Sequence, residues 1–217
     1  MTPRPPVLRV PIVDASRSVL DELLDRAPGH ELADATGRGG PVPATRVSLV
    51  ATREALVALF VASSEPPLAV AHRGRGGRVF EDECVELFLE RPSEPGRYLE
   101  VVVNPAAALY AAEVDNPDGS RASWRVSPVL PRGLEVRVSG APAGEPSAYS
   151  SWRCRLEVPW SEAGGAPSAG EVRRANAFRI ARGLATHHLA LSPTLRRDPP
   201  DFHVPSLFAR LRFTEVL

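Results

Sequence analysis

The chain has 217 residues, of which 43% are hydrophobic, and its 26 basic and 26 acidic residues give a formal net charge of zero. This length suits one domain, and the apolar fraction can supply its core. The charge balance argues against nonspecific binding to nucleic acids or anionic membranes, because both need a basic excess. No apolar run is long enough to cross a bilayer as a helix.

The start of the sequence and its cysteines indicate no secreted scaffold. Residues 1–11 hold two arginines but lack the apolar stretch and cleavage site of a secretory signal. A cytoplasmic location is therefore the default expectation, and a secreted or periplasmic one stays open if a leader precedes this sequence. Cys84 and Cys154 cannot form a disulfide framework, and both fall on predicted strands, so we expect two buried thiols.

The N-terminal region predicts one strand and one helix. Residues 7–13 fit an edge strand, because Pro11 lacks the amide hydrogen that a central strand needs. Residues 14–26 fit a helix that Asp14 or Ser16 can cap. Its apolar stripe consists of Val19, Leu20, Leu23 and Leu24. We expect this helix to cover one open end of a sheet.

Short segments of strand-like sequence, separated by turns, make up the rest of the chain. They lie at residues 45–51, 55–62, 84–90, 98–103, 108–114, 134–139, 152–158, 177–183, 187–191 and 207–213. Nine or ten such strands predict an all-β fold, an antiparallel β-sandwich of two packed sheets with a short N-terminal helical extension. We divide the chain into that extension, residues 1–30, packed on the sandwich, and the sandwich domain, residues 31–217.

The strand at 84–90 has two unlike faces. One face carries Val85, Leu87 and Leu89, and the other carries Cys84, Glu86, Phe88 and Glu90. The aliphatic face should meet a core. A carboxylate on the second face should be paired, hydrogen-bonded or directed into a groove, because an unpaired buried charge is costly. An edge strand with a solvated face is the alternative.

Common catalytic and metal-binding signatures are absent from the sequence. There is no Gly-x-Ser-x-Gly elbow, no His-Glu-x-x-His and no Walker loop. His187 and His188 are neighbours on a strand and point to opposite faces, so they do not predict a metal pair. The Asp-Asn-Pro-Asp-Gly at 115–119 lacks the ligand pattern of an EF-hand and is explained by turn chemistry. We therefore predict a non-catalytic protein without assigned metal ligands.

Five motifs occur in a characteristic order. An acidic turn leads into Asp-Glu-Cys-Val-Glu-Leu-Phe at 82–88. It is followed by Tyr-Leu-Glu-Val-Val-Val-Asn at 98–104, Trp-Arg-Cys-Arg-Leu-Glu-Val-Pro-Trp at 152–160, Arg-Ala-Asn-Ala-Phe-Arg at 174–179, and Leu-Ser-Pro-Thr with Pro-Asp-Phe-His within 191–208. Together they resemble the family 9 carbohydrate-binding modules, and more narrowly their stand-alone relatives in the DOMON-like superfamily. The resemblance spans roughly residues 45–213.

The resemblance implies a bacterial, non-catalytic protein that binds a saccharide in a groove on one sheet, linked to polysaccharide utilisation. In family members that bind glucan or xylan ends, two tryptophans sandwich a terminal sugar. One lies six residues before the strand glutamate, where this chain has Phe80. The family's arginine two residues before the strand-end Asn is Val102 here. The late tryptophan has no clear match, and Phe202 or His203 is the nearest candidate.

Saccharide binding needs an aromatic face and groups that hydrogen-bond to sugar hydroxyls. We expect Phe80 to stack on the sugar and Glu86 and Asn104 to fix its hydroxyls. The further candidates, around the rim, are Arg179, Asp201, Phe202, His203 and Trp124. Trp124 is either an exposed platform or a rim residue, whereas Trp152 and Trp160 match packing positions of the family and are expected in the core.

The departures from the family pattern leave two other interpretations open. The same fold with a degenerate sugar site would serve as a structural or protein-interaction domain. A hydrolase would require two convergent carboxylates with at least one perturbed pKa. The predicted partner is a saccharide, a protein partner stays open, and neither nucleic acid nor membrane is expected. Family 9 modules carry calcium, so the resemblance leaves that ion open as well.

Overall fold

The computed structural model describes residues 4–14, 19–63, 69–140 and 151–215. These residues form one α-helix, three short 3₁₀ turns and fourteen strands. The elements are β1 (Val7–Ile12), α1 (Leu20–Arg26), β2 (Gly29–Glu31), β3 (Ala33–Asp34), β4 (Thr45–Ala51), β5 (Ala55–Ser63), η1 (Val79–Glu81), β6 (Cys84–Glu90), β7 (Arg97–Val103), β8 (Leu109–Asp115), β9 (Arg125–Pro128), β10 (Glu135–Ser139), β11 (Ser151–Pro159), η2 (Trp160–Glu162), β12 (Val172–Arg182), β13 (Thr186–Ala190), η3 (Pro205–Leu207) and β14 (Ala209–Glu215).

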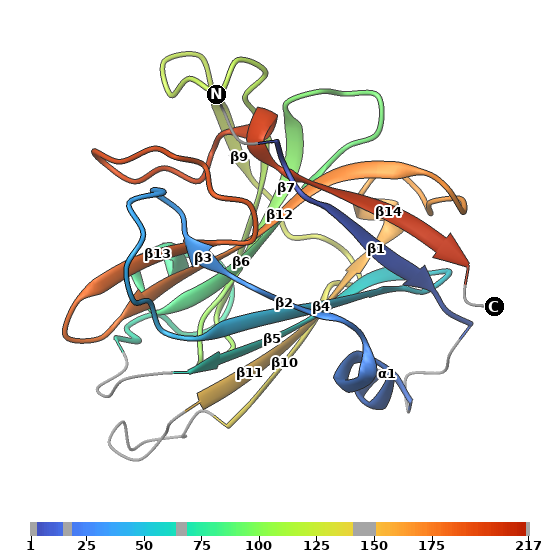
Figure 1. The fold of residues 1–217 in the computed structure, drawn as a ribbon, viewed down its shortest axis with the longest axis horizontal. Coiled ribbons are helices and arrows are strands. Elements are labelled where there is room, and N and C mark those ends of the chain that lie inside the picture. Colours follow the sequence, from blue (N-terminus) through green and yellow to red (C-terminus); the bar gives the residue numbers. More distant parts are fainter. Residues whose placement is uncertain (1–3, 15–18, 64–68, 141–150, 216–217) are drawn as a thin grey trace.

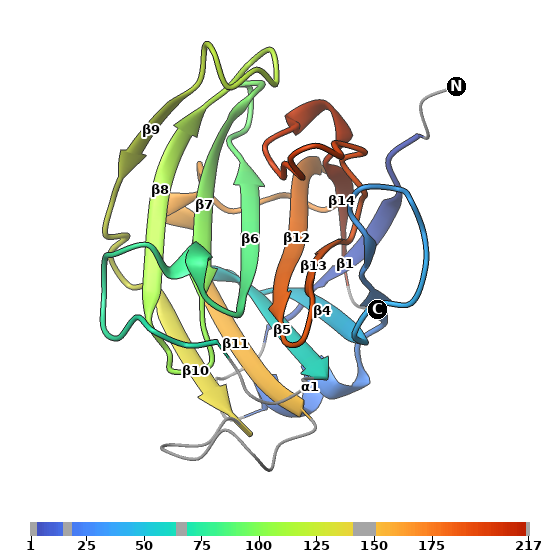
Figure 2. The same cartoon turned by 90° about the vertical axis from the view of Figure 1, so that its left-hand side faces the viewer.

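The strands form one continuous, curled sheet (Figures 1 and 2) in the order β10-β11-β5-β4-β1-β14-β12-β6-β7-β8-β9. Most neighbours are antiparallel, but β1 is parallel to both β14 and β4. The predicted all-β class is confirmed. The chain does not form the two separate antiparallel sheets that were predicted, because the hydrogen bonds of β1 and β14 join the two halves into one sheet. The sheet is a curled half-barrel of mixed strand direction.

The N-terminal strand differs from its prediction as an edge strand. Along its full length β1 pairs with β14, and Ile12 also pairs with Ala51 of β4. Pro11 is tolerated there because the pairing with β4 involves only that one position, so few ladder bonds are lost. The predicted boundary near residue 30 stays a prediction.

The main core fills the concave side of the curl, where the two halves of the sheet face each other. Val85, Leu87 and Leu89 of β6 are buried there, as their alternation predicts. Trp152 and Trp160 belong to the same core, which confirms their predicted structural role. Cys84 and Cys154 are buried free thiols, as expected.

The opposite face of β12, β6, β7 and β8 carries a second apolar layer. Phe88, Tyr98 and Phe178 project from these strands, and Phe202 and Phe208 of the C-terminal segment cover them. This aromatic layer is a cluster separate from the main core. It therefore anchors the long irregular connection between β13 and β14 on the outer face of the sheet.

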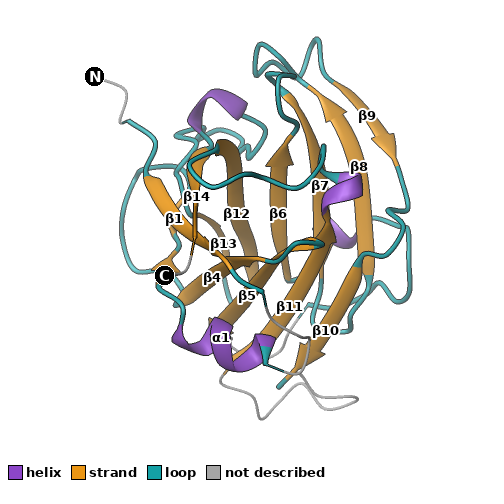
Figure 3. Ribbon diagram, turned by 90° about the vertical axis from the view of Figure 1, so that its right-hand side faces the viewer, coloured by secondary structure: helices purple, strands orange, loops and turns teal. Residues whose placement is uncertain are grey.

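The helix is shorter than predicted and packs on a face of the sheet (Figure 3). Leu20 and Leu24 contact a cluster that includes Val50 and Val57, on the outer side of β4 and β5. The position expected for the helix, over an open end, is therefore wrong. Asp14 caps nothing and pairs with an arginine of the β4–β5 turn, and the other predicted cap, Ser16, lies outside the described residues. In the described part of the chain, no helix has the length and apolar character needed to cross a membrane.

Candidate functional site

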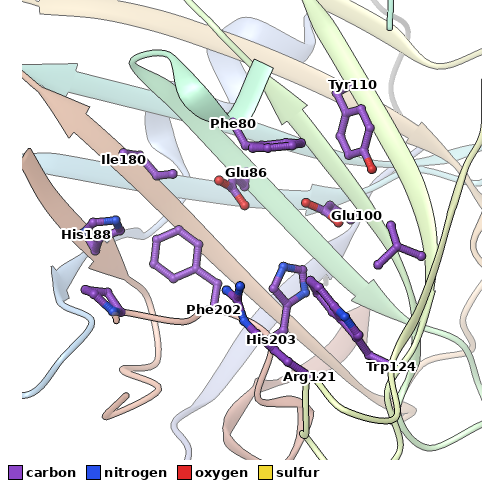
Figure 4. Close-up of a pocket in the computed structure, with 12 residues that line it drawn as sticks. Phe80, Glu86, Glu100, Tyr110, Arg121, Trp124, Ile180, His188, Phe202 and His203 are labelled. Carbon is purple, nitrogen blue, oxygen red and sulfur yellow. The ribbon is translucent and has the colours of Figure 1, made fainter. Parts of the chain in front are cut away.

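A cavity of about 410 Å³ opens on the outer face of the sheet, above β6, β7 and β8 (Figure 4). This volume is typical of sites for small ligands. It is lined by side chains from the strands below and from the loops that surround them: Phe80, Glu86, Glu100, Tyr110, Arg121, Trp124, Val126, Ile180, His188, Pro200, Phe202 and His203.

The pairing of the strands brings two carboxyl groups together on the cavity floor. Glu86 of β6 lies opposite Val102 of β7, and Val102 lies opposite Tyr110 of β8, so these side chains share one face. Glu100 precedes Val102 by two residues and therefore projects to the same side. Glu86 and Glu100 are diagonal neighbours on adjacent strands, a separation at which side chains interact.

Aromatic side chains stand on both sides of the carboxyl groups (Figure 4). Phe80, in η1, packs edge-to-face on Tyr110 with ring centroids 5.3 Å apart. Phe202, on the other side, stacks on Phe178 with ring centroids 4.3 Å apart, so the two rings are nearly parallel. Trp124 packs against His203 with centroids 4.6 Å apart. These contacts fix the aromatic walls in place without a ligand.

Glu86 and Glu100 are deeply buried, with exposed fractions of 3% and 5%. Among the described residues neither forms an ion pair, and the only hydrogen bond is a weak one of 3.7 Å donated by the Cys84 thiol to Glu86. Burial raises the pKa of Glu100 to about 8. Burial, followed by repulsion from Glu100, also raises the pKa of Glu86 well above its ordinary value. At neutral pH a protonated carboxyl at Glu100 can both donate and accept hydrogen bonds.

His203 is a neutral hydrogen-bonding group in the cavity wall. Burial lowers its pKa to about 4, with the Asp201 carboxylate and the Arg121 guanidinium acting in opposite directions. Burial raises the pKa of Tyr98, so its hydroxyl keeps the proton. The Tyr98 hydroxyl lies 2.7 Å from Nδ1 of His203, and the direction of this hydrogen bond follows the imidazole tautomer. In either tautomer a neutral imidazole carries one N–H group and one acceptor nitrogen.

Arg121 and Asp201 form a fixed pair at the rim. The guanidinium donates to both oxygens of Asp201, at 2.8 and 3.1 Å, and lies 5.2 Å from the ring centroid of Trp124. Asp201 also accepts a hydrogen bond from the backbone N–H of His203 at 3.1 Å. The pair therefore cancels its own charge and braces the Trp124 and His203 walls.

Arg179 lies on the other face of the sheet. Its neighbours on β12, Phe178 and Ile180, point to the outer side, so the alternation of a strand directs Arg179 inward. Its guanidinium donates to Glu83 at 2.8 Å and to Thr45 at 2.8 Å. The guanidinium thus joins β12 to Glu83 by an ion pair and to β4 by a hydrogen bond, and Arg179 is not among the cavity-lining residues.

Asn104 also lies outside the cavity lining. At the end of β7 its amide donates to Asp82 at 2.8 Å and to the carbonyl of His72 at 3.0 Å, while its oxygen accepts from two backbone N–H groups of the β7–β8 turn. Asp82 directly follows η1, which carries Phe80. Asn104 therefore helps to hold the end of the η1 turn that carries Phe80.

The structure brings together five of the eight candidates from the sequence: Phe80, Glu86, Trp124, Phe202 and His203. Asp201 reaches the rim through Arg121. Sequence reasoning missed Glu100, Tyr110 and His188. The alternation of β7 places Glu100 on the face of Tyr98 and Val102, but only the register with β6 shows that this face is the one that carries Glu86.

The turn at 115–119 does not supply a calcium site. The Asp118 carboxylate accepts hydrogen bonds from the backbone of Ser120 at 2.9 Å and from the hydroxyl of Ser123 at 2.6 Å, which is turn geometry. Within the described ranges no three acidic, histidine or cysteine side chains gather as metal ligands. The residues present there do not fit the ion.

Residues 39–213 match the sequence profile of Carbohydrate-binding family 9. A candidate carbohydrate-binding protein from Bacteroides uniformis has a similar crystal structure, with a TM-score of 0.78 and 21% identity over 97% of this chain and 100% of that one. A family 9 module from Caldicellulosiruptor kristjanssonii in complex with glucose gives a TM-score of 0.65 at 12% identity, covering 97% of both chains. In complex with cellotriose, a module from the same organism gives 0.61 at 13% identity, over 98% of this chain and 94% of that one. No curated protein matches the sequence.

Proposed function

Because the chain belongs to carbohydrate-binding family 9, we propose that it binds a saccharide in the cavity between Phe80 and Phe202. The family assignment confirms the resemblance inferred from the sequence motifs. Modules of this family are non-catalytic carbohydrate-binding domains, in agreement with the prediction that the chain is not an enzyme.

One observation carries this proposal: aromatic faces flank two hydrogen-bonding carboxyl groups inside one cavity. A pyranose presents apolar C–H faces and a rim of hydroxyls, and this arrangement matches both. The similar structures with glucose and cellotriose support the same kind of ligand. A role in polysaccharide utilisation forms part of the proposal, since cellotriose is a fragment of a glucan.

The side chains divide between contact and support. Phe80 stacks on one face of the sugar, and Phe202 and Trp124 close the opposite side. Glu86 bonds to hydroxyls from the floor, and His203 bonds to them from the wall. Four other groups, Asn104, Asp201, Arg121 and Tyr98, hold these contacts in position.

Two convergent carboxyl groups with perturbed pKa values are also what a hydrolase requires. A glycosidase places its two carboxyl groups on either side of the scissile bond and keeps one ionised. Glu86 and Glu100 project from neighbouring strands on the same side of the cavity, and burial raises the pKa of both. This arrangement suits hydrogen bonding to a ligand rather than attack on it.

Isothermal titration calorimetry, guided by a glycan-array screen, tests the proposal. Phe80→Ala is expected to weaken binding of the best glycan about tenfold, equivalent to about 1.4 kcal/mol, because one stacking face is lost. Leu184→Ala, at a position 92% exposed and absent from the cavity lining, serves as the matched control and should bind as the unaltered protein does. Unchanged binding by Phe80→Ala would place the sugar elsewhere. No binding of any glycan would overturn the proposed function.

A further inference from the structure

The charges that face the cavity do not balance. Glu86 and Glu100 form the floor, and Arg121 is the cation among the lining residues. Both oxygens of Asp201 already bind that guanidinium, at 2.8 and 3.1 Å. The floor carboxyls are therefore left without a positive partner in the described part of the chain.

The other titratable groups around the floor do not supply a positive charge. Burial lowers the pKa of His203 to about 4, and burial followed by the nearby Arg182 lowers the pKa of His188. Tyr98, Tyr110 and Cys84 are neutral or negative in all their ionisation states. When its carboxyls ionise, the floor therefore carries negative charge that none of the described residues offsets.

Such a floor favours a ligand that brings a positive charge. Burying an unpaired carboxylate is costly, and a cation placed between both carboxylates would stabilise the ionised form of each. The aromatic walls act in the same direction, because aromatic faces attract cations: Arg78 lies over the Phe80 ring at 5.6 Å and Arg121 over the Trp124 ring at 5.2 Å. A hydroxyl in the same place gains only ordinary hydrogen bonds.

We propose that the cavity selects an amino sugar, with its free ammonium group lying against Glu86 and Glu100. The inference rests on the proposed function, since it names the class of saccharide for that same site. The ring stacks between Phe80 and Phe202, and the remaining hydroxyls meet His203 and the rim. The ammonium stabilises the ionised carboxyls, so binding releases protons from them into solution.

Three disaccharides that share the same β-1,4-linked backbone distinguish an amino sugar from neutral sugars as the preferred ligand. The glucosamine dimer carries an ammonium at C2 of each ring, cellobiose carries a hydroxyl there, and the N,N′-diacetyl dimer carries a neutral amide. Calorimetry of the full chain is expected to show at least tenfold tighter binding of the glucosamine dimer than of cellobiose. Titrations near pH 6.5 in buffers of different ionisation enthalpy should show net proton release with the amine and none with cellobiose.

Glu100→Gln keeps the shape of the side chain and removes its charge. The variant is expected to lose most of the preference for the amine, so the ratio of its affinities for the glucosamine dimer and for cellobiose should approach one. Glu86→Gln provides a second variant at the same floor, and Glu94→Gln, at an exposed position outside the cavity lining, is the matched control. Circular dichroism of each variant establishes that it is folded.

The outcomes separate the two proposals. Equal or tighter binding of cellobiose, or a preference that survives both floor variants, would overturn the amino-sugar inference and leave saccharide binding in place. Binding of some other glycan but of none of the three dimers would overturn the inference in the same way. Failure of every glycan in the screen would overturn the proposed function itself.

Discussion

Two buried glutamates only three residues apart have opposite environments. Glu83 accepts hydrogen bonds from the Arg179 guanidinium at 2.8 Å, from Trp152 at 3.3 Å and from the backbone of Arg182 at 2.7 Å. Glu86 is 3% exposed, against 1% for Glu83, yet among the described residues it forms no ion pair and accepts only the weak hydrogen bond of the Cys84 thiol. Burial alone therefore does not distinguish a structural carboxylate from a binding one. Their hydrogen-bond partners distinguish them. Glu83, with its full set of partners, stabilises the fold, whereas Glu86 is available to a ligand.

Breaking the ion pair between Glu83 and Arg179 should have the largest effect on stability. Arg179→Met leaves Glu83 buried without its cation, and the loss in the free energy of unfolding is expected to be about 3–5 kcal/mol. Urea denaturation measures it. Because Arg179 points away from the cavity, any variant protein that is still folded should bind the sugar with unchanged affinity. A loss below about 1 kcal/mol would contradict the structural role given to this pair.

The two floor carboxyls, Glu86 and Glu100, should give the protein an unusual dependence of stability on pH. The pKa of Glu100 is raised to about 8 in the folded state, above its ordinary value of 4.5, so the folded protein binds more protons in this interval. The stabilisation that Glu100 contributes is therefore fully present below about pH 4.5, and it is lost as the pH rises toward 8. The loss is expected to be on the order of 2 kcal/mol or more.

Urea unfolding of the wild type and of Glu100→Gln at pH 5 and pH 8 measures this difference. The amide does not ionise, so the variant should become more stable relative to the wild type at the higher pH. The same shift with pH in both proteins would show that Glu100 does not titrate in this range.

The rim pair should contribute least to stability. Arg121→Gln removes a half-exposed guanidinium, and the expected change in the free energy of unfolding is below about 1 kcal/mol. It also loosens the brace on Trp124 and leaves the charge of Asp201 uncompensated at the cavity edge, so affinity for the glucosamine dimer should rise a few-fold relative to that for cellobiose. Calorimetry with both dimers checks this, and a fall in that ratio would contradict the charge argument.

Much of the local structure could be predicted because its signals are local. Alternation of apolar and polar residues located the strands, and it assigned Val85, Leu87 and Leu89 to the core. The order of the motifs identified the family, and a position six residues before Glu86 pointed to Phe80, which does line the cavity. The burial of Trp152 and Trp160 followed from the same motifs.

The tertiary structure decided what depends on pairing between distant segments. Alternation separates Arg179 from Phe178, but it cannot say which of the two faces carries a site. The placement of Glu86 beside Glu100 requires the β6–β7 register, and Arg121 meets Asp201 across 80 residues of sequence. The join of β1 to β14, which turns two expected sheets into one curled sheet, links the two ends of the chain. A single sequence carries no local signal for such contacts, because they are selected by the packing of the whole fold.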